Sequence, residues 1–156
     1  MAGDQCWACR RENRDREFFD ADGWYALLDW RPMVTGHSLL VRVSTDECPR
    51  ELTNDTLAGF EENLVKVTSA LRRHYAATTN VLVASLTGKD PHVHFHLVPV
   101  WPVDEAQWRE ESGLKTGSLF QFLGARERSK PDKELPLSAF GADVDALRGI
   151  VGYVPA

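Results

Sequence analysis

The stretch DPHVHFHLVPV, residues 90–100, alternates histidine with apolar residues and decides the fold that we expect for this chain. It places His92, His94 and His96 at every second position. Successive side chains of a β-strand point to opposite faces, so the three histidines share one face, about 6.6 Å apart per step. We therefore predict a strand over residues 92–100 whose apolar face packs and whose histidine face carries the chemistry.

A purely structural role explains these histidines poorly. Burying imidazoles without partners would cost about 1–3 kcal/mol for each unmet polar group. Two functional interpretations stay open at this point. The three side chains can ligate a catalytic metal, or one imidazole can act as a nucleophile while its neighbours set its tautomer and bind the group that it attacks.

Three further segments outward from this stretch are rich in β-forming residues. EFFDADGWYALLD, residues 17–29, has two apolar segments around an Asp-Gly pair, which favours a hairpin of two strands. HSLLVRV (37–43) predicts another strand, and NVLVASL (80–86) predicts one that pairs with residues 92–100. Together they predict an antiparallel sheet of about five strands.

One long helix is predicted over residues 54–75. Thr53 or Asn54 can cap its start. Apolar residues recur there at steps of three and four, namely Leu57, Phe60, Leu64, Val67 and Leu71. We expect this helix to pack on the sheet, so the predicted fold class is α+β.

The length and composition predict one core. The chain has 156 residues, of which 43% are hydrophobic. We take residues 1–101 as the main unit and residues 102–156 as a C-terminal extension packed on the same domain, with a short closing helix within residues 138–151.

The charge and the hydropathy exclude some classes of partner. A net charge of −5 and a pI near 5.5 argue against a surface that binds long nucleic acid, although small nucleotides remain possible ligands. No run of about 18 apolar residues offers a membrane span, and the start MAGDQCWACRREN lacks the apolar centre of a secretory signal. We expect a soluble, cytoplasmic protein with no membrane partner.

The three cysteines cannot all pair with one another. Cys6 and Cys9 form a C-x-x-C motif, which suits metal or redox chemistry better than a disulfide scaffold. No βαβ pattern surrounds the motif to suggest a thioredoxin-like fold.

Several segments together resemble the histidine-triad family. HVHFHLVP, residues 92–99, matches its signature of His-x-His-x-His followed by apolar residues on a strand. LLDWRPMVTGHSLLV (27–41) resembles the family's strand ending in Asp, Pro-containing turn, Gly-His pair and second strand, and VASLTGKDPHVHFH resembles the strand and loop before the triad. The resemblance covers roughly residues 6–100 and implies that residues 1–101 form a histidine-triad domain.

The resemblance implies cleavage at the α-phosphate of a substituted nucleotide through a nucleotidyl-histidine intermediate. His94 would be the nucleophile, because a neutral imidazole attacks phosphorus without first losing a proton. His96 would bind the phosphate and help to protonate the leaving group, which is a phosphoramidate amine or part of a dinucleoside polyphosphate. His37 would orient an imidazole or contact the phosphate.

The resemblance also implies the nucleotide contacts. Asp29 would accept hydrogen bonds from the ribose hydroxyls, and Trp30 would stack or pack on the base. The loop after the fourth strand would face the phosphates through Ser85, Thr87, Gly88 and Lys89. Relatives often carry an amide side chain in this loop and Pro-Arg after the triad, whereas this chain has neither and continues with Pro99-Val100-Trp101.

The C-x-x-C motif resembles the zinc-binding branch of the family, in which two early cysteines join two later ligands. The last of these is the first triad histidine, here His92. Relatives usually have a histidine as the third ligand, but this chain has none in that region, and Cys48 takes its place. The implied site of Cys6, Cys9, Cys48 and His92 is a closed, structural zinc that pins the N-terminal segment to the triad strand.

The resemblance thus implies a nucleotide hydrolase or nucleotidyl transferase. It also implies a homodimer formed by extending the sheet, for which an unpaired strand edge offers the route. Two alternatives remain: a nucleotide-binding or adaptor module with weak turnover, and a metalloenzyme that uses the three strand histidines.

Overall fold

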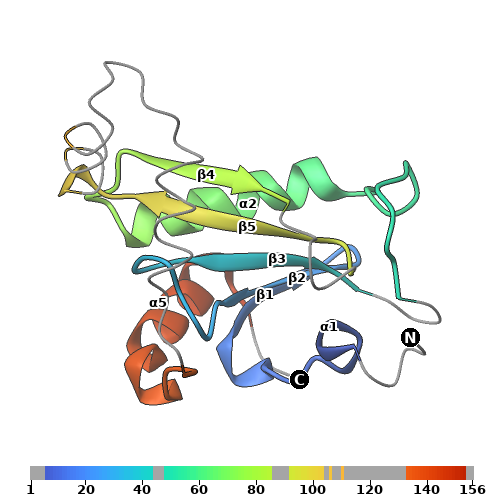
Figure 1. The fold of residues 1–156 in the computed structure, drawn as a ribbon, viewed down its shortest axis with the longest axis horizontal. Helices are drawn as coiled ribbons and strands as arrows, with labels where there is room; N and C mark the ends of the chain where they lie inside the picture. The colour runs from blue at the N-terminus through green and yellow to red at the C-terminus, as the bar shows by residue number, and fades with distance from the viewer. Residues whose placement is uncertain are drawn as a thin grey trace.

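Five antiparallel strands form one sheet in the order β1-β2-β3-β5-β4 (Figure 1). The computed structural model describes residues 6–43, 48–85, 92–103, 106, 110 and 133–153. The strands are β1 (Glu17–Ala21), β2 (Trp24–Leu28), β3 (Ser38–Arg42), β4 (Asn80–Ala84) and β5 (His94–Val100). The predicted α+β class with an antiparallel sheet of five strands is confirmed.

The hairpin of β1 and β2 turns at the predicted Asp-Gly pair. Asp22 and Gly23 have φ angles of 51° and 77°, and positive values at both positions are typical of the tight turn that joins twisted strands. The turn sets the register in which Ala21 pairs with Trp24. A β-bulge between Glu17 and Phe19 interrupts β1.

The long helix α2 (Phe60–His74) begins later than predicted. The sequence predicted a start near residue 54, but residues 54–59 form turns, and Gly59 has a left-handed φ of 73° that interrupts a continuous helix. The expected cap at Thr53 exists, since its side-chain oxygen accepts a hydrogen bond from the Thr56 N–H at 3.2 Å. It stabilises a preceding turn and not the helix itself.

The triad strand also begins later than predicted. β5 starts at His94, because Val93 donates its N–H to the Pro49 carbonyl at 2.7 Å in place of a ladder bond. His92 therefore precedes the strand. Likewise β4 ends at Ala84, before the predicted end at residue 86.

Two apolar clusters cover the two faces of the sheet. On one face α2 and α5 (Gly141–Val151) pack against β1, β2, β3 and β5 through a cluster that includes Trp24, Leu40, Leu71, Leu97 and Leu147. On the other face α1 (Trp7–Arg10) contributes Ala8 to a smaller cluster with Tyr25, Leu27, Leu39 and Val41. Two short 3-10 helices, η2 (Arg14–Arg16) and η3 (Leu137–Ala139), precede β1 and α5.

The alternation of β5 follows the prediction. Phe95 and Leu97 belong to the cluster under α2, so His94 and His96 point to the face that carries α1. The helix α5 lies within the segment where a closing helix was predicted, whereas the division of the chain at residue 101 stays a prediction. In the described part of the chain, no helix is long and apolar enough to cross a membrane.

Gly36 is a position where the fold requires glycine. Its φ is +83°, and a Cβ atom there would lie 2.6 Å from Cε2 of the buried Tyr75. We expect Gly36→Ala to lower the free energy of unfolding by more than about 2 kcal/mol in chemical denaturation, through backbone strain and overpacking. Gly149→Ala is the matched control in α5, where nothing lies within 4 Å, and should raise stability by about 0.5–1 kcal/mol. Equal effects of the two substitutions would contradict this account.

Candidate functional site

Three histidines lie together on the α1 face, two within β5 and one directly before its neighbour β3. β3 and β5 pair so that Leu39 lies opposite His96, and His37 immediately precedes β3. The Nε2 atom of His37 lies 2.9 Å from Nδ1 of His96, and the rings of His94 and His96 have centroids 5.2 Å apart. His37, His94 and His96 are all buried.

The backbone fixes the proton position of His94. Its Nδ1 atom lies 2.6 Å from the carbonyl oxygen of His92, and a carbonyl oxygen can only accept a hydrogen bond. The proton of the neutral ring therefore sits on Nδ1. Nε2 is left with its lone pair, which is the arrangement that a nucleophilic imidazole needs.

A chain of hydrogen bonds likewise sets the tautomers of the neighbouring His37 and His96 rings. The Met33 N–H donates to Nδ1 of His37 at 3.1 Å, so the proton of neutral His37 lies on Nε2 and is donated to Nδ1 of His96. A neutral His96 that accepts at Nδ1 must carry its own proton on Nε2. His96 therefore presents an N–H donor at Nε2.

Asp29 lies beside this chain, directly after β2. It is 4% exposed; its Oδ1 accepts the Arg31 N–H at 2.8 Å, and its Oδ2 lies 3.3 Å from Nδ1 of His37. The carboxylate therefore shapes the turn before β3 and places negative charge beside the buried histidines. Ligand atoms of Asp29, His37 and His96 lie within 4.8 Å of one another.

Two tryptophan rings pack on the same face. Trp7 lies edge-on to Trp30, with ring centroids 5.0 Å apart, and edge-on to His94 at 6.1 Å. Sequence reasoning named Trp30 but missed Trp7. Trp7 could have been found from its place between Cys6 and Cys9. If the two cysteines bind at the triad strand, the residues between them must lie near that strand as well.

The predicted phosphate loop is described only in part. Ser85 follows β4 and is exposed. Thr87, Gly88 and Lys89 lie outside the described residues.

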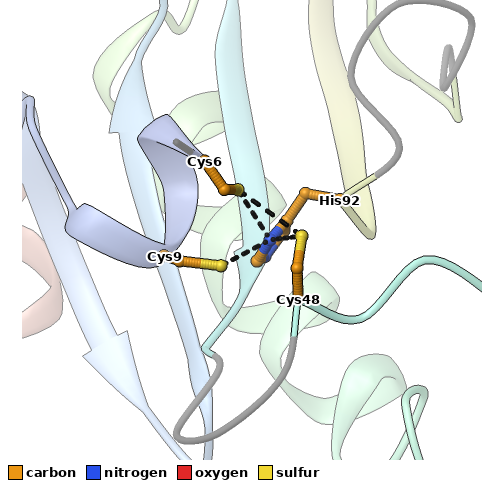
Figure 2. Close-up of side chains that lie close together, drawn as sticks. All are labelled: Cys6, Cys9, Cys48 and His92. Atoms are coloured by element: carbon orange, nitrogen blue, oxygen red, sulfur yellow. Dashed lines mark hydrogen bonds between the residues drawn. The ribbon is translucent and has the colours of Figure 1, made fainter. Parts of the chain in front are cut away.

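Three cysteines surround His92 (Figure 2). The sulfur atoms of Cys6, Cys9 and Cys48 lie 3.4, 3.5 and 3.3 Å from Nδ1 of His92, and all four donor atoms lie within 4.8 Å of one another. The cysteines are free thiols. We refer to these four residues as the Cys3His group.

The donor set of the Cys3His group fits a tetrahedral metal. The Nε2 atom of His92 lies 2.6 Å from the carbonyl oxygen of Arg42, so Nε2 carries the proton and the lone pair of Nδ1 faces the sulfurs. Three thiolates and one imidazole are a common ligand set for structural zinc. His92 is buried with its ring oriented by the backbone, as outer contacts commonly orient metal-binding histidines.

The thiols of Cys9 and Cys48 need a cation to ionise at neutral pH. Burial, followed by hydrogen bonds with Cys6 and Cys48, raises the pKa of Cys9 to about 12. Burial likewise raises the pKa of Cys48. A bound cation favours the thiolate and displaces the proton, so metal binding to this group should release protons.

The geometry separates His92 from the other two triad histidines. Among the described residues, His92 groups with the cysteines, whereas His96 groups with Asp29 and His37. No described group of ligands combines His92, His94 and His96. This arrangement argues against a metal held by the three strand histidines.

The comparison with known families agrees with the geometry. A family model described as the HIT domain matches residues 10–102, which is more than half of the chain. The chain belongs to the HIT, or histidine triad, family. Members of this family generally act as nucleotide hydrolases or transferases. No curated protein matches the sequence significantly.

Solved structures of HIT proteins share the fold. A hypothetical histidine triad nucleotide-binding protein from Sulfolobus tokodaii is 19% identical, with a TM-score of 0.63 over 94% of this chain and 92% of that one. A zinc-bound histidine triad family protein from Mycobacterium smegmatis is 17% identical, with a TM-score of 0.60 over 96% and 95%. The Plasmodium falciparum diadenosine triphosphate hydrolase is 12% identical, with a TM-score of 0.60 over 90% and 78%.

Opposite tautomers are expected within the triad. Because each proton faces a backbone carbonyl, His92 should carry it on Nε2 and His94 on Nδ1. Long-range ¹⁵N–¹H correlation spectra of uniformly labelled protein at alkaline pH measure this directly. Finding both rings in the same tautomer would contradict the geometry. His74, on α2, is a reference histidine outside the triad.

Proposed function

We propose that this HIT protein cleaves substituted nucleotides at the α-phosphate through a covalent intermediate on Nε2 of His94. The substrate would be a nucleoside phosphoramidate or a dinucleoside polyphosphate. The observation that carries the proposal is the His94 tautomer: a buried imidazole with its proton held by the His92 carbonyl and its lone pair on Nε2. Such a ring can attack phosphorus without a separate base.

The proposed reaction has two displacements. First, Nε2 of His94 forms a bond to the α-phosphorus while the bond to the leaving amine or phosphate breaks. The ring becomes cationic, and the His92 carbonyl oxygen stabilises the Nδ1–H that shares this charge. Water then attacks phosphorus, the P–N bond breaks, and His94 returns to its neutral state with release of the nucleoside monophosphate.

His96 would act as the general acid of the first displacement. With the ring cationic, Nε2–H would pass to the leaving group while the Nδ1 proton stays on His96 and faces Nε2 of His37 at 2.9 Å, so that His96 ends neutral. In the second displacement Nε2 of the neutral ring would take a proton from the attacking water. General acid or base help of this kind is worth about 10²–10⁴-fold in rate.

Asp29, Trp30 and the loop after β4 would bind the nucleotide. Asp29 would accept ribose hydroxyls, Trp30 would pack on the base, and Ser85 with residues 87–89 would donate to the phosphates. The leaving-group side differs from many relatives, because Trp101 follows the triad and donates its indole N–H to the Thr35 carbonyl at 3.0 Å. This difference favours, as a second candidate, a nucleotide-binding module with weak turnover.

The Cys3His group would hold a structural zinc. The donor set supports this assignment, as does the zinc-bound HIT relative from Mycobacterium smegmatis. When bound, the ion would supply charge that stabilises the thiolates and a crosslink between α1 and the start of β5. A homodimer and a cytoplasmic location stay predictions from the sequence.

The covalent step can be trapped by mass spectrometry. Wild-type protein is mixed with adenosine 5′-phosphoramidate or diadenosine triphosphate and quenched early without acid. We expect an added mass of one nucleotidyl group on wild type and none on His94→Gln, with turnover reduced by more than about 10³-fold. His74→Gln, a change on α2 outside the site, should behave as wild type. Turnover that survives in His94→Gln would contradict the mechanism.

Zinc content and turnover should respond to different substitutions. Elemental analysis of protein purified with zinc should give one zinc per wild-type chain, and Cys48→Ser should lose most of it because a thiolate ligand is removed. His94→Gln should keep its zinc while losing activity. A Cys48→Ser protein with full zinc content would exclude this thiol as a ligand.

A further inference from the structure

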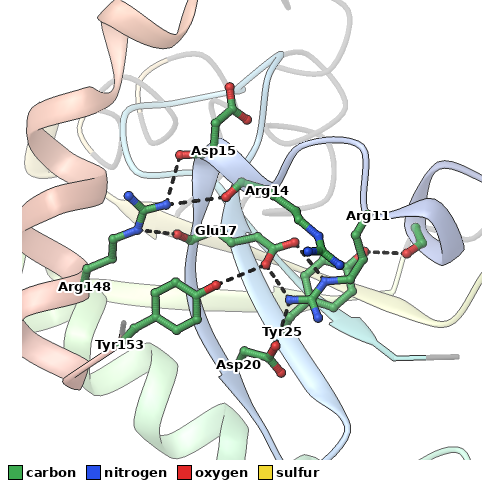
Figure 3. A network of polar contacts seen from close by, with 9 residues as sticks. Arg11, Arg14, Asp15, Glu17, Asp20, Tyr25, Arg148 and Tyr153 are labelled. Atoms are coloured by element: carbon green, nitrogen blue, oxygen red, sulfur yellow. Dashed lines mark hydrogen bonds and ion pairs between the residues drawn. The ribbon is translucent and has the colours of Figure 1, made fainter. Parts of the chain in front are cut away.

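A buried carboxylate links the two ends of the described chain. Glu17, at the start of β1, is 1% exposed. Side chains from the region of α1 and from the region of α5 both reach it (Figure 3). A buried carboxylate needs charged and hydrogen-bonding partners, so its contacts are constraints on the segments that provide them.

On the metal side, Glu17 fixes the residue that ends α1. The guanidinium of Arg11 binds the carboxylate in a bidentate manner, Nε to Oε1 at 3.0 Å and Nη2 to Oε2 at 2.5 Å. Arg11 has a left-handed φ of 49° and donates its backbone N–H to the Ala8 carbonyl. The Arg11 side chain is thus joined to the turn that presents Cys6 and Cys9.

Tyr25 completes the attachment of α1 to the sheet. The Arg11 guanidinium lies over the Tyr25 ring, 4.6 Å from its centroid. The Tyr25 hydroxyl donates to the Ala8 carbonyl at 3.0 Å, between the two cysteines of the motif. A helix of four residues has little stability of its own, so α1 depends on such contacts.

On the other side, the C-terminal helix fixes Glu17 and the segment before it. Arg148 of α5 donates from Nε to the Glu17 carbonyl at 2.8 Å and from Nη2 to the Asp15 carbonyl at 3.3 Å. The Tyr153 hydroxyl donates to Oε2 of Glu17 at 3.5 Å. Oε2 of Glu17 therefore accepts hydrogen bonds both from Arg11, next to α1, and from Tyr153, which follows α5.

We propose that Glu17 is a positioning residue through which α5 holds α1 in place, so that the C-terminal helix controls how firmly the Cys3His group retains its metal. The inference rests on the proposed metal site. It assigns to Arg148 and Tyr153, which lie far from the ligands in sequence, a part in that site. Removing the outer contacts of metal ligands commonly costs 10–100-fold in metal affinity, and Glu17 acts one step further out.

A neighbouring ion pair is exposed, in contrast to the buried pair of Arg11 and Glu17. Arg10 and Glu12 also pair beside α1, but their side chains are 51% and 45% exposed. Exposed pairs contribute little, because water screens them and their side chains lose freedom on pairing. Glu12→Gln is therefore a matched control for Glu17→Gln: the same chemical change, in the same part of the chain, without burial.

The first test measures zinc retention. Full-length zinc-loaded variants are mixed with excess chromogenic chelator, and the rate of zinc transfer is recorded. We expect Glu17→Gln to release zinc about tenfold faster than wild type, Arg148→Gln and Tyr153→Phe to release it faster by smaller factors, and Glu12→Gln to match wild type. If Glu17→Gln fails to fold, the zinc release rates of Arg148→Gln and Tyr153→Phe test the proposal. Wild-type release rates in the folded variants would overturn the proposal.

The second test separates this inference from the metal assignment. Hydrogen exchange of metal-free protein follows the amides of Arg10, Arg11 and Glu12, which donate to carbonyls of α1 and its N-cap Cys6. They should exchange faster in Arg148→Gln than in wild type, whereas amides of α2 should be unchanged. If wild type binds no zinc but this difference is seen, the metal assignment fails and the mechanical link stands. If the amides near α1 are unchanged, the link itself is wrong.

Discussion

The two-residue period of β5 is the constraint on which the rest of the structure depends. It sends Phe95 and Leu97 into the cluster under α2 and sends His94 and His96 to the opposite face. A shift of register by one residue would exchange the two sets and bury the imidazoles among apolar side chains. Pairing with β3 then brings His37 to His96, and the backbone at His92 sets the proton on His94. Packing and chemistry therefore depend on one register.

The sequence predicted those parts of the fold that depend on local patterns. The alternation of residues 92–100 and the Asp-Gly turn have short-range causes, and both are present. The boundaries that differ have one local and one tertiary cause. α2 begins at Phe60 because Gly59 adopts a left-handed conformation, and the glycine is a local signal that the apolar periodicity outweighed. β5 begins at His94 because Val93 bonds to Pro49, and that contact has no signature in the local pattern.

The site was predictable to the extent that residue type and family motif carry it. The triad, His37 and the cysteines have distinctive chemistry, so they could be named before their positions were known. Glu17 could not, because its partners Arg11 and Arg148 lie 6 and 131 residues away and each is an ordinary charged residue in the sequence. The packing of Trp7 beside His94 likewise depends on the position of α1. Long-range polar contacts and tertiary packing are what a single sequence conceals.

The turn between β2 and β3 is held from several sides before any ligand arrives. Thr35 accepts the Trp101 indole N–H, Trp30 accepts the Leu135 N–H through its carbonyl, and Asp29 binds the Arg31 N–H. Ordering a flexible loop costs conformational entropy, which is subtracted from the affinity of the ligand that orders it. Here that entropy is lost when the chain folds. A ligand that contacts this turn would bind a surface that is already ordered. Little of its interaction energy would therefore be lost to ordering the turn.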